Sequence, residues 1–394
     1  MFFQDLGRVL RKNIREYGMY IALFAIMGIF TIATKGLFLS PRNLSNLFNQ
    51  SGYIAVLAVG MTLVIVIRCI DLSVGFLGGF LGAVAAIMLL SWGLPVYVVI
   101  PLVLGLGIVA GMITAYPIAV LGIPSFVASL AGWLIYRGLI GVVTSGSGTI
   151  IIANKFYNAI GNGYIPDIPG LTAFLPHVHK LTMLLGILAV VLYIRSALSS
   201  RRKKQAYKFE VMPMSIFILQ LILVAVIVLG VTWVLAGYNG LSWTLIVVLL
   251  VVGIYQFITT QTVLGRHIYA TGGNPEAAEL SGISVKRVTF IVFASMGMLA
   301  ALAGILFSSR LQSATTTAGT LWELDAIAAA YVGGVSAAGG VGSVVGSLIG
   351  ALVMISLTNG MNLMGIDANV QYIVRGFVLA AAVIFDVYTR KSAR

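Results

Sequence analysis

Long runs of apolar residues with almost no charge constrain this chain more than any other feature. Stretches such as Tyr20 to Ile32, Val96 to Ala115 and Leu241 to Ile258 approach or reach the length of about 20 residues that a helix needs to cross a bilayer. Only 9% of the 394 residues are charged and 60% are hydrophobic, whereas a soluble domain carries about 25% charged residues. Because so few charges cannot cover a water-facing surface, the sequence predicts a protein that folds in lipid.

Hydropathy predicts an all-α fold, a polytopic transmembrane helical bundle of about 10–12 spans. Residues 324–337 are short for a full crossing, and residues 121–144 begin with Gly122-Ile123-Pro124, so either segment could be a re-entrant or broken helix. The expected spans lie near residues 17–37, 52–68, 73–91, 96–119, 125–144, 181–198, 213–235, 241–260, 288–309, 324–337, 341–360 and 371–388.

Most of the 24 basic side chains lie in loops that face the inner side when the N-terminus is placed in the cytoplasm. The clusters Arg8 to Arg15, Arg201 to Lys208 and Arg390 to Arg394 follow the positive-inside rule, which predicts that both termini are cytoplasmic. Topology therefore explains the formal charge of +13, and we expect no nucleic acid partner.

Glycines spaced four residues apart predict close contacts between helices. Small residues at this spacing let two backbones approach in lipid, where burying a large apolar side chain gains little. We expect such contacts at Gly75 with Gly79, Gly78 with Gly82, Gly342 with Gly346, and Gly346 with Gly350.

The chain lacks the residue patterns of a soluble enzyme. It has no GxxxxGK[ST] phosphate loop, so we do not expect it to bind and hydrolyse ATP itself. Cys69 is the only cysteine, and His177 and His179 in the long outer loop have no third ligand at a helical spacing, so we expect no metal site. We predict no catalytic residues and no cofactor bound by this chain.

Charged residues in or beside the spans are candidates for function, because burying a charge in lipid is costly. Arg68 and Asp71 are three residues apart and could pair across one helical turn, and Asp386 is expected near the inner interface, facing water. Asp325 and Arg375 lie deeper: they could pair and hold two helices together, or they could relay protons in a secondary transporter.

Neutral polar residues near the ends of several spans suit the passage of a neutral, hydroxyl-rich solute, because amides and hydroxyls both donate and accept hydrogen bonds. The same residues could instead cap helices or join them. The candidates for the translocation pathway are Asn46, Gln50, Asp71, Ser73, Ser125, Asp325, Asn359 and Asn362.

The polar segment 261–287 contains the pattern of a short helix on the inner side. Asn274 can cap it, Pro275 fits its first position, Glu276 and Glu279 favour its positive end, and Gly282 can end it. A helix of two turns between two spans has little structural purpose, so we expect it to bind a partner protein.

This segment resembles the coupling loop of the permeases of ATP-binding-cassette (ABC) importers, and its amino-acid sequence is similar to that of the ribose/xylose class of carbohydrate permeases. Arg68-Cys69 departs from the class, where small or acidic residues are usual, so no role is transferred there. The other matching blocks are Asn43 to Gln50, Ile70 to Gly75, Ile123 to Phe126, Glu323 to Ala329, Gly333 to Gly342, and Gln371 with Val374 and Gly376.

The resemblance implies a multi-pass permease of the bacterial cytoplasmic (inner) membrane that carries a xylose-like pentose or related aldose. Residues 1–394 would form one permease domain with 261–287 as its cytoplasmic coupling loop. The implied partners are a second copy of the permease, a tandem-domain ABC ATPase that holds ATP and Mg, and a periplasmic or extracellular sugar-binding protein. The ATPase-coupling residues would be Pro275, Glu276, Ala277, Ala278, Glu279, Leu280, Ser281 and Gly282.

The resemblance also identifies two additional spans. Those near 181–198 and 213–235, on either side of the basic loop, are similar to the longer xylose and multiple-sugar branch of the class.

Three other functions remain as alternatives. The related ABC permeases for branched-chain amino acids carry zwitterions, and no charged pocket for them is evident in the sequence. A proton-coupled secondary transporter would need no ATPase and would depend on Asp325. A channel would need a ring of charges or a carbonyl filter, which the sequence does not suggest.

Overall fold

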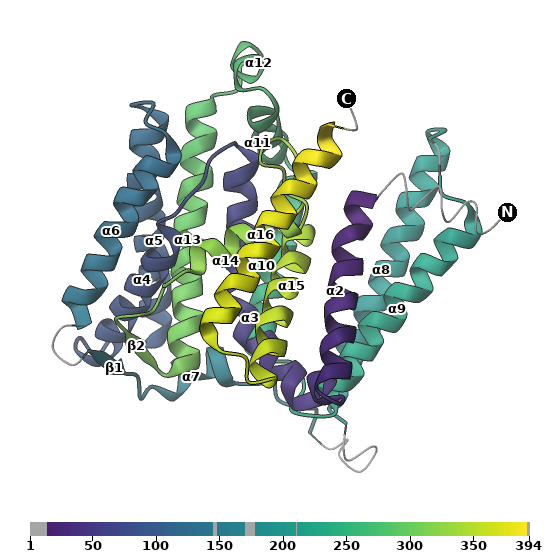
Figure 1. Cartoon of the computed structure of the whole chain (residues 1–394), viewed down its shortest axis with the longest axis horizontal. Helices are drawn as coiled ribbons and strands as arrows, with labels where there is room; N and C mark the ends of the chain where they lie inside the picture. Colours follow the sequence, from purple (N-terminus) through teal and green to yellow (C-terminus); the bar gives the residue numbers. More distant parts are fainter. Residues whose placement is uncertain (1–13, 145–147, 170–177, 210, 392–394) are drawn as a thin grey trace.

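The computed structural model describes residues 14–144, 148–169, 178–209 and 211–391, and nearly all of its ordered elements are helices (Figure 1). In chain order they are α2 (Ile14–Ala33), η1 (Leu37–Leu39), α3 (Pro41–Val66), α4 (Val74–Leu90), α5 (Val96–Ala119), α6 (Ser125–Thr144), β1 (Thr149–Ile151), α7 (Lys155–Asn162), α8 (Lys180–Ala206), α9 (Met214–Ala236), α10 (Trp243–Gln261), α11 (Val263–Gly273), α12 (Pro275–Leu280), α13 (Val285–Leu311), β2 (Ser313–Thr315), α14 (Trp322–Val332), α15 (Val344–Leu363) and α16 (Ala368–Lys391).

The helices match the expected spans. Within the described residues, nine helices are long and apolar enough to cross a membrane. Gly18–Ala33 and Val74–Leu90 are apolar but shorter. Each predicted span coincides with a helix, and the prediction of an all-α membrane bundle is confirmed.

Side-chain caps mark where many of these helices begin. Ser40, Ser242, Ser284 and Ser343 each precede a long helix, and each hydroxyl accepts the backbone N–H three residues ahead. Pro41 follows Ser40 at the first position of α3, where its missing N–H costs nothing. Local sequence therefore sets the starts of α3, α10, α13 and α15.

Helix α3 forms the centre of the bundle. In its most apolar window 89% of the residues are buried, compared with 11% for α9 and α16. Helices α10, α13, α14 and α15 all pack against α3. A helix that is apolar on every side is stable in this position because other helices, and not lipid, cover it.

Two predicted glycine contacts lie between helices, as expected. A Cβ at Gly78 or Gly82 of α4 would lie 2.9 Å from a carbonyl oxygen of α13. A Cβ at Gly346 or Gly350 of α15 would overlap the end of α14. A further contact, between Gly107 of α5 and α13, joins the pair of helices that pack most extensively and was not predicted.

The other two glycine pairs are confirmed as close contacts only in part, because one member of each pair does not face a second helix backbone. Gly75 faces the side chain of Glu323 in α14 and the carbonyl of Gly319, and Gly79 faces the carbonyl of Ala318, in the turns that precede α14. Gly342 precedes α15 and faces the side chain of Val335. Spacing predicts that a small residue is needed, but it does not reveal whether the neighbour is a helix.

Helix α14 is the broken element. It has 11 residues, so the turns before it and the loop after it complete this crossing. Its first residue, Trp322, is 5% exposed and packs on the rings of Tyr53 and Phe307, with ring centroids 4.6 Å apart in both cases. Helix α6 is continuous over 20 residues, so Pro124 only precedes it and does not break it.

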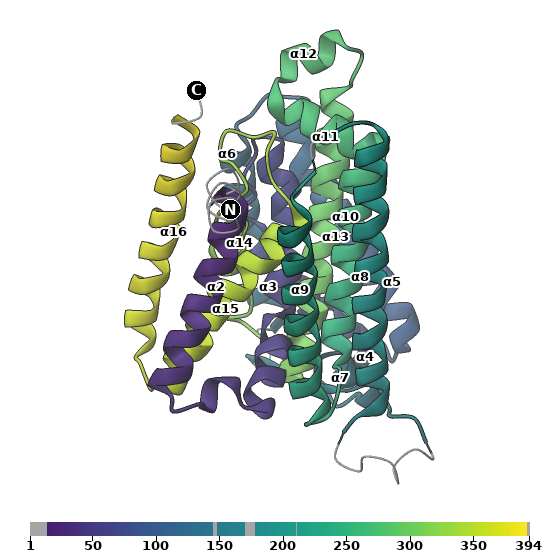
Figure 2. The ribbon, with the colours of Figure 1, turned by 90° about the vertical axis from the view of Figure 1, so that its right-hand side faces the viewer.

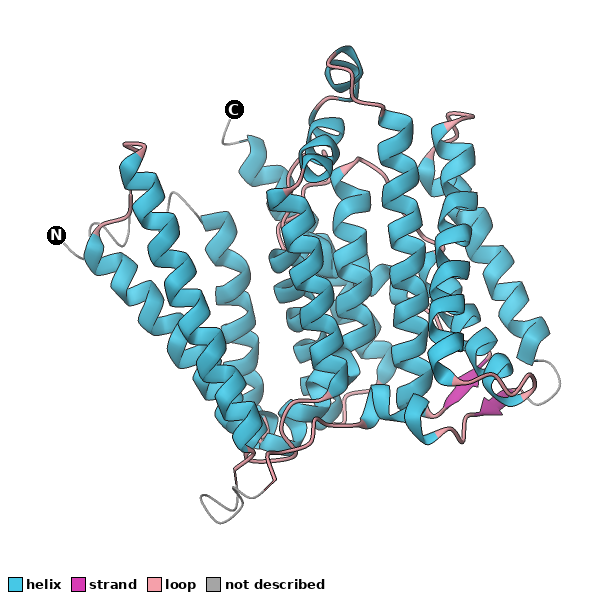
Figure 3. Ribbon diagram, turned by 180° about the vertical axis from the view of Figure 1, so that it is seen from behind, coloured by secondary structure: helices cyan, strands magenta, loops and turns pink. Residues whose placement is uncertain are grey.

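Helices α2, α8 and α9 lie together at one side of the bundle (Figures 1 and 2). Helices α8 and α9 form a hairpin, with Gly186 pressed against Thr232. At the opposite end of the bundle from α12, β1 and β2 form a short antiparallel ribbon, which Figure 3 shows in magenta.

Candidate functional site

The polar segment 261–287 folds as two helices joined at one residue. Thr262 caps α11, and Asn274 caps α12 by accepting the backbone N–H of Ala277 at 3.1 Å. Pro275 is the first residue of α12, and Gly282 follows the helix with φ +82°. The predicted short helix is confirmed to within one residue, whereas α11 was not expected.

Helix α12 extends beyond the rest of the bundle (Figures 1 and 2). Only Ala278 is buried, at 4% exposure, and it faces back toward the chain. Glu276 and Glu279 are exposed, and the apolar side chain of Leu280 is 91% exposed. An acidic helix with a bare leucine at its end has the features of a docking element, because binding would cover that leucine.

A joint links this segment to the end of α3. We name it the inner joint and define it by Val66, Arg68, Gly272, Gly273 and Gly340. The carbonyl of Val66 accepts the N–H of Gly340 at 2.8 Å, and a Cβ at Gly272 would overlap that same carbonyl. Three parts of the chain therefore meet without space for a side chain: the end of α3, the end of α11 and the loop between α14 and α15.

Arg68 holds the inner joint together. Its Nε donates to the carbonyl of Gly272 at 2.6 Å, and its Nη2 donates to the carbonyl of Gly273. The predicted pairing of Arg68 with Asp71 is wrong, because the left-handed backbone of Arg68, with φ +64°, ends α3 and the guanidinium reaches the end of α11.

Asp71, Ser73 and Ser125 shape the loop between α3 and α4. One carboxylate oxygen of the buried Asp71 accepts both the backbone N–H of Ser73, at 2.9 Å, and its hydroxyl, at 2.6 Å. The hydroxyl of Ser125 accepts the N–H of Ile70 at 3.0 Å. These three candidates are thus brought together at the end of α3 that adjoins α11.

The candidate amides lie near the N-terminal end of α3 and the C-terminal end of α15. Asn43 and Asn359 donate to each other at 2.9 and 3.2 Å, and the amide of Gln371 donates to Asn362 at 2.7 Å. These bonds join α3 to α15 and α15 to α16. Of the other two candidates, Asn46 is half-buried and Gln50 is exposed.

Asp325 and Arg375 form an ion pair between α14 and α16. The Nη1 of Arg375 lies 3.2 and 3.1 Å from the two carboxylate oxygens, and the side chains are 19% and 20% exposed. The pair borders a cavity of about 160 Å³ that is partly open to the surface. The lining residues are Leu321, Leu324, Asp325, Ala328, Met354, Tyr372, Arg375, Gly376 and Leu379.

Other buried charges have partners that sequence reasoning missed. Glu323 accepts the indole N–H of Trp133 at 3.0 Å. Asp386 is 4% exposed and accepts from the hydroxyl of Ser336 at 3.2 Å, so the expectation that it faces water is wrong. The guanidinium of Arg137 lies over the ring of Trp133 at 5.2 Å. For Glu323, the sequence sign that could have been used is its place two residues before the candidate Asp325.

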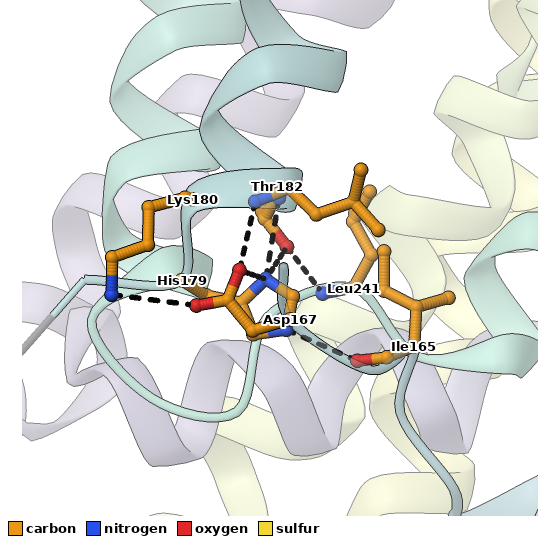
Figure 4. Close-up of polar contacts among 7 residues, drawn as sticks. Ile165, Asp167, His179, Lys180, Thr182 and Leu241 are labelled. Carbon is orange, nitrogen blue, oxygen red and sulfur yellow. Dashed lines mark hydrogen bonds and ion pairs between the residues drawn. The ribbon is translucent and has the colours of Figure 1, made fainter. Parts of the chain in front are cut away.

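A polar cluster ties the α8–α9 hairpin to the loops before and after it (Figure 4). His179 caps α8 through Nδ1, while its Nε2 lies 3.0 Å from the carbonyl of Ile165. Thr182 accepts the N–H of Leu241 at 3.0 Å, and Lys180 lies 3.5 Å from Asp167. His179 therefore has a structural role.

The carboxylate of Asp167 is the charged centre of that cluster. Burial raises its pKa, but the backbone N–H groups of Leu181, Ile168 and Lys180 and the nearby His179 outweigh this and lower the pKa to about 2. A lowered pKa stabilises the fold above the unfolded value of 3.8, and this stabilisation is lost as the pH falls toward 2.

We therefore expect Asp167→Asn to lower the melting temperature of the detergent-solubilised protein by a few degrees at neutral pH. The difference from the unsubstituted protein should stay constant between about pH 8 and pH 5 and shrink below about pH 4. Asp367→Asn, in the loop between α15 and α16, is the matched control. A difference that grows as the pH falls would contradict this account of Asp167.

No group of three His, Cys, Asp or Glu side chains that could hold a metal ion occurs in the described part of the chain. His177 lies outside the described residues.

Comparisons with known proteins agree with the geometry. A family profile described as "Branched-chain amino acid transport system / permease component" matches residues 43–383. The chain is 41% identical to the xylose transport system permease protein XylH of Haemophilus influenzae, over 96% of this chain and 98% of the relative. It is 40% identical to XylH of Escherichia coli, over 96% and 93%. It is 35% identical to the ribose import permease protein RbsC of H. influenzae, over 95% and 93%.

No solved structure matches the chain significantly. The family match confirms the prediction of a multi-pass membrane permease that is not itself an enzyme, and the relatives confirm the resemblance to the ribose/xylose class. The chain therefore belongs to the family of branched-chain amino acid transport system permease components.

Proposed function

We propose that this chain is the membrane-spanning subunit of an ATP-driven importer for a xylose-like pentose or related aldose. Similarity along nearly the whole chain carries the proposal: identity is 40–41% with the xylose permeases and 34–35% with the ribose permeases. The matches span 96% of this chain for the xylose permeases and 94–95% for the ribose permeases.

The working unit we propose has several subunits in the bacterial cytoplasmic membrane. Two copies of residues 1–394 form the pathway, a tandem-domain ATPase binds ATP and Mg on the cytoplasmic side, and a sugar-binding protein delivers the substrate outside. Both termini are cytoplasmic, in keeping with the basic clusters of the sequence and with α16 ending on the side from which α12 extends (Figure 1).

Segment 261–287 is the proposed coupling loop, and α12 is the part that enters the ATPase. The exposed Glu276, Glu279 and Leu280 would contact the ATPase. Movement of α12 would reach α11 directly and then the inner joint, where Gly272 and Gly340 touch. Gly340 lies in the loop that follows α14, so a path of contacts connects the ATPase side to the middle of the bundle.

Transport of branched-chain amino acids is the second candidate, because the family description names it. The XylH and RbsC relatives favour the sugar. A proton-coupled mechanism is less well supported, because both oxygens of Asp325 are engaged by Arg375 in a contact that joins α14 to α16.

The proposal is tested by reconstituting the permease in vesicles with the ATPase and binding protein that copurify with it. We expect uptake of radiolabelled xylose that requires ATP and continues when the proton gradient is collapsed. Uptake of leucine and not xylose would favour the second candidate. Uptake that needs no ATPase and stops when the gradient is collapsed would overturn the proposal.

Glu276→Arg is expected to abolish this uptake and to lose the copurifying ATPase, because it reverses a charge at the exposed end of α12. The melting temperature of the isolated permease should not change. Lys204→Glu, a reversal at an exposed site of α8, is the control and should leave uptake intact. Normal uptake by the Glu276→Arg protein would contradict the role of α12.

A further inference from the structure

We propose that the cavity between α14, α15 and α16 is a weak binding subsite for the hydroxyl groups of a neutral sugar in transit. The Asp325–Arg375 pair would supply its hydrogen bonds. This inference rests on the proposed function and deepens it, since it states where the bundle contacts its substrate.

The position of the cavity fits a transit site. Arg375 lies about 10 Å along α16 from Ala368, by the helical rise of 1.5 Å per residue, so the pair lies well away from that end of the helix. Asp325 lies in the first turn of α14, which begins within the bundle and not at its surface. Irregular backbone at membrane depth is tolerated where it is covered by protein or borders a water-filled cavity.

The pair retains unused hydrogen-bonding capacity. Arg375 uses Nη1 alone to contact both oxygens of Asp325. Its Nε–H is buried and has no hydrogen-bond partner among the described residues. A buried donor without a partner costs about 1–3 kcal/mol, so a ligand that accepts from this guanidinium would remove a standing penalty.

The chemistry selects a neutral, hydroxyl-bearing ligand. A carboxylate that accepts and a guanidinium that donates can both bond hydroxyl groups without changing the net charge of the site. A zwitterion would have to separate Asp325 from Arg375, whose atoms are 3.1 Å apart. Leu321, Leu324, Ala328, Met354 and Leu379 provide apolar surface for the C–H faces of a sugar ring. A cavity of about 150 Å³ holds a six-membered benzene ring, which is similar to the space available.

The cavity is also connected to the inner joint. Helix α14 ends at Val332, where Gly333 packs against Gly346, and the loop that follows reaches Gly340. A displacement of the inner joint would therefore move one wall of the cavity relative to α16. Weak binding in such a place allows release, which transport requires.

Protection of a cysteine gives a direct test. Cys69 is replaced by serine, Leu324→Cys is introduced at the exposed edge of the cavity, and the assembled transporter is treated with a small charged thiol reagent in the presence of xylose or leucine. We expect xylose to slow modification several-fold and leucine to leave it unchanged. Thr316→Cys, exposed in the segment before α14, is the control that neither solute should protect. Protection by leucine alone, by both solutes or by neither would overturn the proposal.

Swapping the charges separates binding from packing. Asp325→Asn with Arg375→Gln should raise the KM for xylose about tenfold, as expected for the loss of one charge-assisted hydrogen bond. Asp325→Arg with Arg375→Asp restores an ion pair between α14 and α16 and should restore the yield of folded transporter, but KM should stay high because donor and acceptor have changed places. A swap that returns KM to its original value would show that the pair only holds helices together. If the swap restores KM while the unsubstituted transporter takes up xylose in the same assay, only the binding subsite is disproved and the proposed function still holds.

Discussion

Gly272→Ala is expected to stop ATP-driven uptake of sugar. Its Cβ would overlap the carbonyl oxygen of Val66 and lie 2.7 Å from the backbone nitrogen of Gly340. Neither neighbour is a flexible side chain, so α11 must move away from α3 and break the contact between Val66 and Gly340. Overpacking of this kind costs about 1–3 kcal/mol, which is large for a single methyl group. Uptake, ATP hydrolysis and melting temperature are measured on the assembled transporter.

The adjacent glycine offers a matched control. A Cβ at Gly273 would meet nothing within 4 Å, although the residue lies in the same helix. Alanine is about 1 kcal/mol more favourable than glycine within a helix, so Gly273→Ala should keep uptake and should not lower the melting temperature. Equal effects of the two substitutions would mean that the inner joint is not a tight contact.

Arg68→Gly is expected to separate ATP hydrolysis from sugar uptake. Arg68 follows the last turn of α3 with φ +64°, in a pattern where its N–H bonds Ile65 and the N–H of Cys69 bonds Val64. Glycine is usual at such a position, and a residue with a side chain there costs about 1–2 kcal/mol of backbone strain. The substitution therefore relieves strain while it removes both hydrogen bonds to α11. We expect the melting temperature of the protein to stay the same or rise. ATP hydrolysis should continue, and sugar uptake per ATP hydrolysed should fall at least several-fold.

Two further variants define the role of Arg68. Arg68→Lys keeps the charge but cannot contact two carbonyls with one planar group, so it should restore coupling only in part. Lys204→Ala removes an exposed basic residue from α8 and should have no effect. If Arg68→Gly lowers stability and hydrolysis together and leaves uptake per ATP unchanged, Arg68 is only a structural residue.

Both variants act on the inner joint, and their combined outcomes indicate how movement would pass through it. Gly272→Ala pushes the parts of the joint apart, whereas Arg68→Gly releases them. Loss of uptake in both cases would mean that α3, α11 and the loop after α14 must move as one unit. Loss in the first case alone would mean that close packing suffices and the guanidinium contributes little.

The coupling helix was the part of the site that sequence predicted best. Asn274, Pro275 and Gly282 act on the backbone within a few residues of themselves, so the helix they define does not depend on the rest of the fold. Helix α11 was missed because an 11-residue helix continues almost directly from α10, and Thr262 is the only local sign of the break.

Arg68 shows why other site residues could not be predicted. Its spacing from Asp71 allows a local pair, yet the backbone turns left-handed at Arg68, and the guanidinium reaches Gly272, 204 residues away in the sequence. The pair of Asp325 with Arg375 was an open possibility for the same reason: two charges of opposite sign 50 residues apart meet only if α14 and α16 are neighbours.

The sequence by itself determined that this protein folds in lipid, where its helices lie, where the coupling helix is and that the chain belongs to a permease family. Hydropathy, helix caps and sequence motifs suffice for this because they are local properties. Only the tertiary structure decided which glycines face helices and which face turns, where α14 interrupts the bundle, and which buried charges meet. Those outcomes depend on contacts between residues far apart in the chain. In lipid such contacts form through close backbone packing and specific hydrogen bonds, which hydropathy does not encode.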